Sequence, residues 1–126
     1  MSSNCQVTKN LNLKEIECPC CKGCVYDQAF VDYLQILRDI MQTPFYYKPG
    51  GFYRCLFYND SLPNSSPNSK HMRGIACDIL THNWSSNEKW KFVRSAMSLG
   101  LSIGLYSVHI HADLRRGEPC LFYGCY

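Results

Sequence analysis

The residues Ser107–Arg115, SVHIHADLR, alternate strictly between apolar and polar side chains. Because successive side chains of a β-strand point to opposite faces, this alternation predicts a strand with one apolar face against a core. The core-facing residues would be Val108, Ile110, Ala112 and Leu114. The opposite face would carry His109, His111, Asp113 and Arg115. Same-face neighbours stand roughly 6–7 Å apart, so this face is either a solvated surface or the floor of a site.

A second alternating segment begins after Gly74, a residue expected to supply a backbone geometry that other residues resist. Apolar side chains recur at every second position, and Asp78 lies on the face opposite to them. A carboxylate is costly to bury without a partner, so Asp78 within this apolar strand requires one. His71 stands just before the strand, where the alternative use is a loop histidine bonded to backbone.

Imidazole nitrogen and carboxylate oxygen are both ordinary zinc ligands. A set of two histidines and one aspartate leaves a fourth coordination position open, which is the arrangement of catalytic rather than structural zinc sites. His71, Asp78 and a histidine of the 107–115 strand are therefore candidate zinc ligands.

Two helices frame these strands. Apolar residues at spacings of three and four predict a helix from Asp27, its capping residue, to about Met41. A second helix is expected over residues 86–98, since Ser85 and Glu88 form a capping-box pattern and Gly100 provides a left-handed stop.

The remaining segments complete a mixed fold. Extended segments around a turn are expected over residues 45–58, a polar loop over 59–70, and a strand over 101–106. Residues 1–17 have no periodic pattern and are expected to form an N-terminal extension. The chain thus predicts a single α+β domain over residues 1–126, with a small antiparallel sheet and flanking helices.

Composition narrows the classes of partner. The chain has 126 residues, 46% hydrophobic and 18% charged, with a formal charge of +3, and no run of basic residues exceeds two. Nucleic-acid binding is therefore not expected. The protein is expected to be a monomer. The first twenty residues lack a signal-peptide pattern, and no apolar stretch approaches the roughly 20 residues that span a bilayer. We expect a soluble product made in the cytoplasm, without membrane insertion.

The chain has nine cysteines, four of them in the knot CPCCKGC. Cys18, Cys20, Cys21 and Cys24 could hold a second, structural zinc, or serve packing or redox roles. Disulfide bonds could also form among the cysteines that are more distant in sequence, and their pairing cannot be deduced from sequence. These cysteines are Cys55, Cys77, Cys120 and Cys125.

Three segments together resemble a known family. SKHMRGIACDI is similar to the S-x-H-x-x-G-x-A-x-D motif of peptidase family M15, the D-Ala-D-Ala carboxypeptidase and phage endolysin group. GLYSVHIHADLR is similar to its closing G-x-Y…H-x-D-x-R segment, and residues 33–59 resemble its leading helix and S-G-Y-R-c-x-x-x-N strand. The resemblance runs from about Cys18 to Arg115 and implies a hedgehog-like zinc-peptidase fold.

The resemblance also implies roles for single residues. His71, Asp78 and His111 would be the zinc ligands, and Arg54 would bind a carboxylate or carbonyl of a peptide substrate. Many members place an acid three residues before the last histidine ligand, to accept a proton from the attacking water. That position is Val108 here, so His109 is the expected general base or oxyanion stabiliser.

Residues beside the ligands would support them. Ser69 would orient His71 or cap a turn. Asp113 would orient a histidine or pair with Arg115.

The resemblance implies a peptidoglycan carboxypeptidase or endopeptidase that hydrolyses amide bonds of cell-wall peptides. A domain without a signal peptide is similar to phage lysis proteins, which reach the bacterial cell wall through a holin. Two alternatives stay open: a non-catalytic zinc-binding module that recognises a cell-wall peptide or a protein, and a cysteine-rich structural or virion protein.

Overall fold

The computed structural model describes residues 5–63 and 65–124. The helices are α1 (Leu13–Ile16), α2 (Gln28–Met41), α3 (Leu56–Ser61), the 3₁₀ helix η2 (Lys70–Arg73) and α4 (Ser86–Ser98). The strands are β1 (Gln6–Thr8), β2 (Leu11–Asn12), β3 (Ala76–Leu80), β4 (Ser102–Leu105), β5 (His109–Asp113) and β6 (Leu121–Tyr123). The α+β class is confirmed. None of the helices in these described parts is long and apolar enough to span a bilayer.

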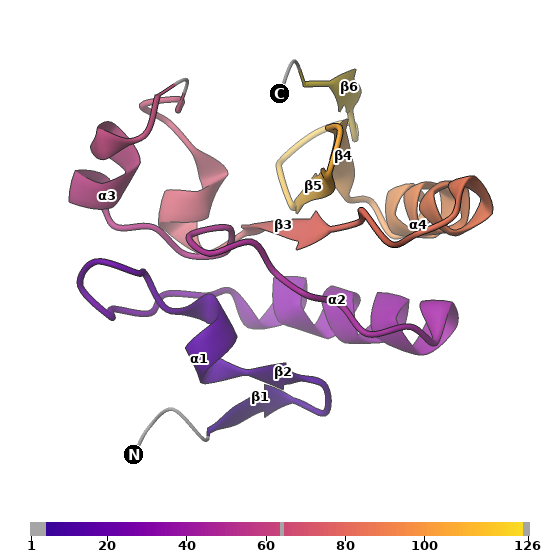
Figure 1. Cartoon of the computed structure of the whole chain (residues 1–126), viewed down its shortest axis with the longest axis horizontal. Helices are drawn as coiled ribbons and strands as arrows, with labels where there is room; N and C mark the ends of the chain where they lie inside the picture. Colours follow the sequence, from indigo (N-terminus) through magenta and orange to yellow (C-terminus); the bar gives the residue numbers. More distant parts are fainter. Residues whose placement is uncertain (1–4, 64, 125–126) are drawn as a thin grey trace.

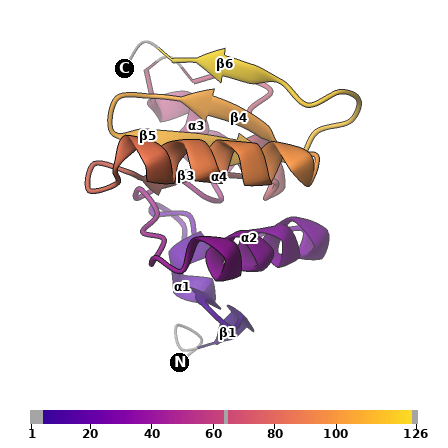
Figure 2. The same ribbon diagram turned by 90° about the vertical axis from the view of Figure 1, so that its right-hand side faces the viewer.

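The main sheet has the order β3-β5-β4-β6. Its first three strands pair antiparallel, as expected, whereas β6 joins β4 in parallel (Figure 1). One face of the sheet packs on α2 and α4; in Figure 2, α2 lies below the sheet and α4 in front of it. The core between them is formed by apolar residues of both layers: Phe30, Leu34, Leu37, Cys77, Ile79, Phe92, Val93, Ala96, Ile103, Ile110 and Ala112.

Local capping chemistry sets both long helices at the bounds predicted from sequence. The Asp27 side chain accepts a hydrogen bond from the Phe30 amide and starts α2. Ser85 and Glu88 form the reciprocal capping box of α4, in which each side chain accepts from the other residue's amide. Gly100 follows α4 with φ +93°, so the left-handed stop is confirmed.

Two expectations need correction. Residues 56–58 are not extended but open α3, because the Cys55 sulfur accepts from the Tyr58 amide and caps a helical turn there. Val108 does not face the core; it is 50% exposed because the strand begins only at His109. Leu114 lies just past the end of β5 and packs, partly buried, against the core, as expected.

The N-terminal residues, which showed no pattern, contribute to the core. Strands β1 and β2 form a hairpin, and the Asn12 side chain with Glu15 makes a capping box for α1. Leu11 and Ile16 are buried, so this segment covers the underside of the core next to α2.

Gly74 ends η2 and turns the chain into β3. Its φ is +69°, and a Cβ at this position would lie 2.2 Å from the Val25 carbonyl oxygen. The expectation of a special backbone geometry is confirmed. We expect Gly74→Ala to lower the free energy of unfolding by at least about 3 kcal/mol, since left-handed strain and a clash with backbone add together.

Gly100→Ala is the matched control for this prediction. Gly100 has φ +93°, but a Cβ there would meet no atom within 4 Å. Its cost should therefore be limited to backbone strain, about 1 kcal/mol. Urea denaturation of the two variants would measure the difference, and equal stabilities would contradict the role given to Gly74.

Candidate metal centre and cavity

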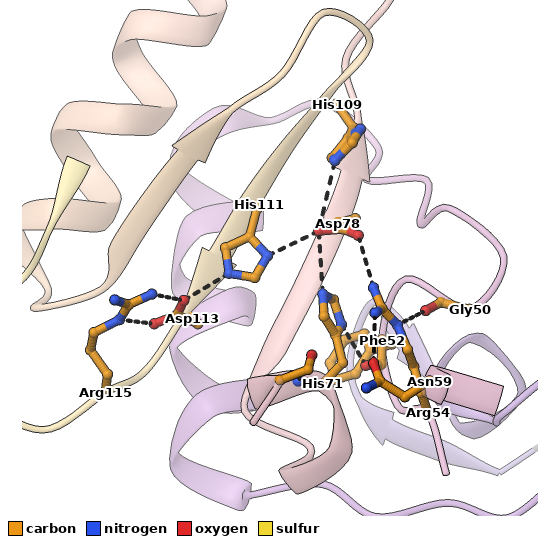
Figure 3. Close-up of polar contacts among 11 residues, drawn as sticks. Gly50, Phe52, Arg54, Asn59, His71, Asp78, His109, His111, Asp113 and Arg115 are labelled. Atoms are coloured by element: carbon orange, nitrogen blue, oxygen red, sulfur yellow. Dashed lines mark hydrogen bonds and ion pairs between the residues drawn. The ribbon is translucent and has the colours of Figure 1, made fainter. Parts of the chain in front are cut away.

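The pairing of β3 with β5 brings Asp78 and His111 together. The two residues are direct partners in the antiparallel register, so their side chains leave the same face of the sheet. The His111 Nδ1 lies 3.1 Å from the Asp78 Oδ1. This face is opposite to the one that packs on α2 and α4, as the alternation of both segments predicts (Figure 3).

His71 reaches the same carboxylate from η2. Its Nε2 lies 3.5 Å from the Asp78 Oδ1, and its Nδ1 lies 2.8 Å from the Phe52 carbonyl oxygen. Because a carbonyl only accepts, Nδ1 carries the proton and Nε2 presents its lone pair toward Asp78. Ser69 accepts from the His71 amide and so caps the turn.

His111 is held in the complementary way. Its Nε2 lies 2.7 Å from the Asp113 Oδ2, so Nε2–H donates to that carboxylate, and in the neutral ring Nδ1 is the nitrogen that could bind a metal beside Asp78. Asp113 is fully buried and also accepts from the Arg115 Nε at 2.8 Å. A metal-binding histidine ordinarily donates its outer N–H to a carboxylate or carbonyl, and both histidines here do so.

The three side chains fit a zinc ion in number, chemistry and spacing. One ligand atom from each of His71, Asp78 and His111 can be chosen so that all lie within 4.8 Å of one another. Each histidine turns one ring nitrogen toward the aspartate, and the other nitrogen of each ring is hydrogen-bonded on the far side. Two nitrogens and one oxygen leave a fourth position for water or substrate.

Burial and hydrogen bonding set the charges of the cluster. Burial lowers the pKa of His71 below its ordinary value, which favours the neutral, metal-binding form. Burial alone would raise the pKa of Asp78, but the adjacent imidazoles of His111 and His71 outweigh it and hold that pKa well below the usual range. For His111 burial lowers the pKa, yet the bonds to Asp113 and Asp78 prevail and raise it. Asp78 is therefore an anion that organises the site.

His109 stands on the same face, two residues before His111. Its Nε2 lies 4.0 Å from the Asp78 Oδ1, and its ring stacks on Tyr106 with the centroids 4.3 Å apart. Its Nδ1 is buried and has no hydrogen-bond partner within residues 5–63 and 65–124. Burial lowers the pKa of His109, so its imidazole is neutral at a lower pH than an ordinary histidine.

Arg54 approaches the second carboxylate oxygen of Asp78, the one that the histidines do not contact. Its Nη2 lies 3.7 Å from the Asp78 Oδ2, while Nε donates to the Gly50 carbonyl and Nη1 to the Asn59 side chain. Asn59 is fully buried, and sequence reasoning missed its role. The signal was available, because Asn59 is the last residue of the segment that resembles the R-c-x-x-x-N pattern.

A cavity of about 640 Å³ lies over these residues. It is lined by residues between α3 and η2, among them Ser65, Ser66 and Asn68, and by four basic side chains, Lys48, Arg54, Lys70 and Arg115. Among its described lining residues Asp78 is the one carboxylate. The cavity therefore favours an anionic ligand, and neither Lys48 nor Tyr106 in its wall was anticipated from sequence.

The outer hydrogen bond to His111 can be tested on its own. We expect Asp113→Asn to weaken zinc binding at this centre by about 10–100-fold, because the amide no longer carries the charge that fixes and polarises His111. Chelator competition measures the affinity. Asp32→Asn, an exposed change on α2, is the control, and equal affinities in the two variants would contradict this role.

The cysteine cluster differs from the expected one. The sulfur of Cys55 lies next to those of Cys18, Cys20 and Cys21, whereas Cys24 packs against the hydrophobic core. The predicted set therefore has the wrong fourth member, because the knot folds toward the start of α3. The eight described cysteines are free, and Cys125 lies outside the described residues.

No protein-family model, curated protein or solved structure matches the chain.

Proposed function

We propose that this protein is a zinc-dependent peptidase that hydrolyses amide bonds of peptidoglycan peptides. The observation that carries the proposal is the convergence of His71 and His111 on Asp78, with the outer nitrogen of each histidine bonded away from the cluster. Two histidines that merely filled a core would not need to converge on one buried carboxylate. The resemblance of the three sequence segments to a cell-wall peptidase family agrees with it.

The chemistry follows from the donor set. A zinc ion at this centre would supply Lewis-acid activation of the scissile carbonyl and of the attacking water. His109 stands beside the centre as a buried neutral imidazole, and we assign it the acceptance of the proton that the water gives up. Its stacking on Tyr106 fixes the plane of the ring and thus the direction in which its nitrogens point.

The basic cavity wall provides the binding of substrate. The guanidinium of Arg54 is held by Gly50 and Asn59 at the edge of the centre, where it orients a carboxylate or carbonyl of the peptide. Lys48 and Lys70 extend the positive surface along the cavity. A stem peptide with free carboxylates has the charge that this wall complements, and acts as substrate at the bacterial cell wall after release from the cytoplasm.

One observation favours a second candidate, a zinc-binding module that recognises the same peptides without cleaving them. Val108 occupies the usual acid's position, and among the described residues lining the cavity there is no carboxylate apart from Asp78. If His109 cannot accept a proton, the centre would bind peptide and leave it intact.

Hydrolysis assays separate the two. Zinc-loaded protein is incubated with a synthetic stem peptide ending in D-Ala-D-Ala and, separately, with purified peptidoglycan. We expect release of D-alanine or of new amino groups, loss of that release after chelation, and recovery when zinc is added. Peptidoglycan that sediments with zinc-loaded protein while no product forms would instead establish the binding module.

A further inference from the structure

Four cysteine sulfurs meet at the junction of two segments that are distant in sequence. Cys18, Cys20 and Cys21 come from the loop after α1, and Cys55 comes from the residue that caps α3. The sulfurs of Cys18 and Cys20 lie 3.6 Å apart, and that of Cys55 lies 3.6 Å and 3.3 Å from them. All four lie within 4.8 Å of one another.

These separations suit four ligands of one tetrahedral metal. With zinc–sulfur bonds of about 2.3 Å, the sulfurs of a tetrahedral site stand about 3.8 Å apart. The observed distances of 3.3–3.6 Å are close to that value without any ion in place. Cys18 and Cys21 also have the C-x-x-C spacing common in structural zinc sites.

The backbone around the cluster is arranged to stabilise thiolates. The Cys55 amide points to the Cys18 sulfur at 3.5 Å, the Gly23 amide to the Cys21 sulfur at 3.3 Å, and the Tyr58 amide to the Cys55 sulfur at 3.4 Å. Such N–H donors favour the charged form of sulfur, which is the form that binds metal.

The loop that presents three of the cysteines is itself tightly closed. The Lys22 amide donates to the Cys18 carbonyl, and the Cys18 amide donates to the Gly23 carbonyl, each at 2.9 Å. Lys22 adopts φ +62°, an uncommon geometry for a residue with a side chain. This turn points the sulfurs of Cys18, Cys20 and Cys21 to one side.

Packing does not account for the cluster. Free cysteines that serve as small apolar residues are among the most buried side chains, but Cys20 and Cys21 are exposed. Cys24 shows the contrast, since it comes from the same loop and does pack against the hydrophobic core.

We propose that Cys18, Cys20, Cys21 and Cys55 bind a second zinc ion, and that this ion is structural. Four thiolates close its coordination sphere and leave no position for water or substrate. The site is separate from the centre at Asp78, and the proposal does not depend on the chain being a peptidase.

The ion has a defined task in the fold. Cys55 follows Arg54, the Arg54 amide donates to the His71 carbonyl, and the Tyr53 amide donates to the Ile16 carbonyl. A metal that joins Cys55 to the 18–21 loop therefore fixes the segment that carries Arg54 between the N-terminal region and the candidate metal centre.

Elemental analysis of protein purified under reducing conditions tests the proposal. Wild type should contain about two zinc ions per chain, and His71→Ala about one, held by sulfur. Cys20→Ser and Cys55→Ser should each lose about one zinc, whereas Cys24→Ser, the control from the same loop, should keep both. Wild type with one zinc and His71→Ala with none would overturn the proposal, as would iron in place of zinc or a zinc content unchanged in both cysteine variants.

A second measurement covers the case in which the serine variants fail to fold. Cobalt(II) is added to zinc-free wild type, and sulfur-to-cobalt charge-transfer bands with tetrahedral d–d bands are expected. Their absence would overturn the proposal, as would a Cys18–Cys55 or Cys20–Cys55 disulfide in peptide maps of freshly purified protein. Absence of these cobalt bands would not bear on the proposed centre at His71, so each of the two proposals can be refuted without the other.

Discussion

Asp78→Ala should remove about one zinc ion per chain and reduce peptide hydrolysis by at least about 10³-fold. Asp78 is 5% exposed and lies within 4.0 Å of His71, His109, His111 and Arg54. Its loss removes one of the three proposed ligands and leaves a guanidinium among imidazoles without the carboxylate that balances it. We therefore also expect the metal-free variant to lose about 3–5 kcal/mol of unfolding free energy.

Two further variants sharpen this prediction. Asp78→Asn keeps the shape of the side chain and loses its charge, so it should fold better than the alanine variant but still lose the zinc ion. Asp60→Ala changes an exposed aspartate of α3 and should alter neither zinc content nor stability. Full zinc content in Asp78→Ala would show that Asp78 is not a ligand.

The stabilising effect of Asp78 should depend on pH in a defined direction. Its pKa in the folded protein lies well below the unfolded value of about 3.9. Its contribution is thus fully present above that value and is lost as the pH falls below it. The Asp78→Asn variant should lose this acid sensitivity, which denaturation at several pH values in the presence of chelator would measure.

His109→Ala should lower kcat/KM by about 10²–10⁴-fold while the zinc content is retained. The reason is its place beside the centre: Nε2 stands 4.0 Å from Asp78, and the ring is buried and stacked on Tyr106. His82→Ala, which removes an exposed histidine from a turn, is the control and should leave kcat/KM unchanged. Equal, background-level hydrolysis by wild type and His109→Ala would favour the binding module.

A glutamine at the same position distinguishes proton transfer from oxyanion stabilisation. Glutamine can donate a hydrogen bond but cannot accept the proton of water at neutral pH. If His109 is the base, His109→Gln should be as inactive as the alanine variant; if it stabilises an oxyanion, substantial activity should return. Burial lowers the pKa of His109, so the decrease of kcat/KM on the acid side of the wild-type pH profile should occur below about pH 6.5. This decrease should be seen at pH values at which the protein still holds its full zinc content.

The parts of the fold that obey local rules could be predicted from sequence. Capping by Asp27 and by the Ser85–Glu88 pair placed both long helices. Strict alternation placed Asp78 and His111 on the faces opposite to the core. These signals are contained within a few neighbouring residues, so no tertiary information was needed.

Other features depend on contacts between distant segments. That Asp78 and His111 are direct partners is set by the strand register, which the alternation of each strand alone does not fix. Cys55 joins the cysteine cluster because the chain before α3 crosses the 18–21 loop. Likewise Leu11 and Ile16 are buried by tertiary packing of a segment that has no periodicity of its own.

The measurement that tests the central claim most directly is the digestion of purified peptidoglycan by wild type and His71→Ala, with products identified by mass spectrometry. His71 contributes only its Nε2 to the centre, and this variant should keep the zinc held by the cysteines. We predict cleaved stem peptides or released D-alanine with wild type and background with His71→Ala. Equal product release by both proteins, or none from wild type that carries zinc at His71, Asp78 and His111, would contradict the claim.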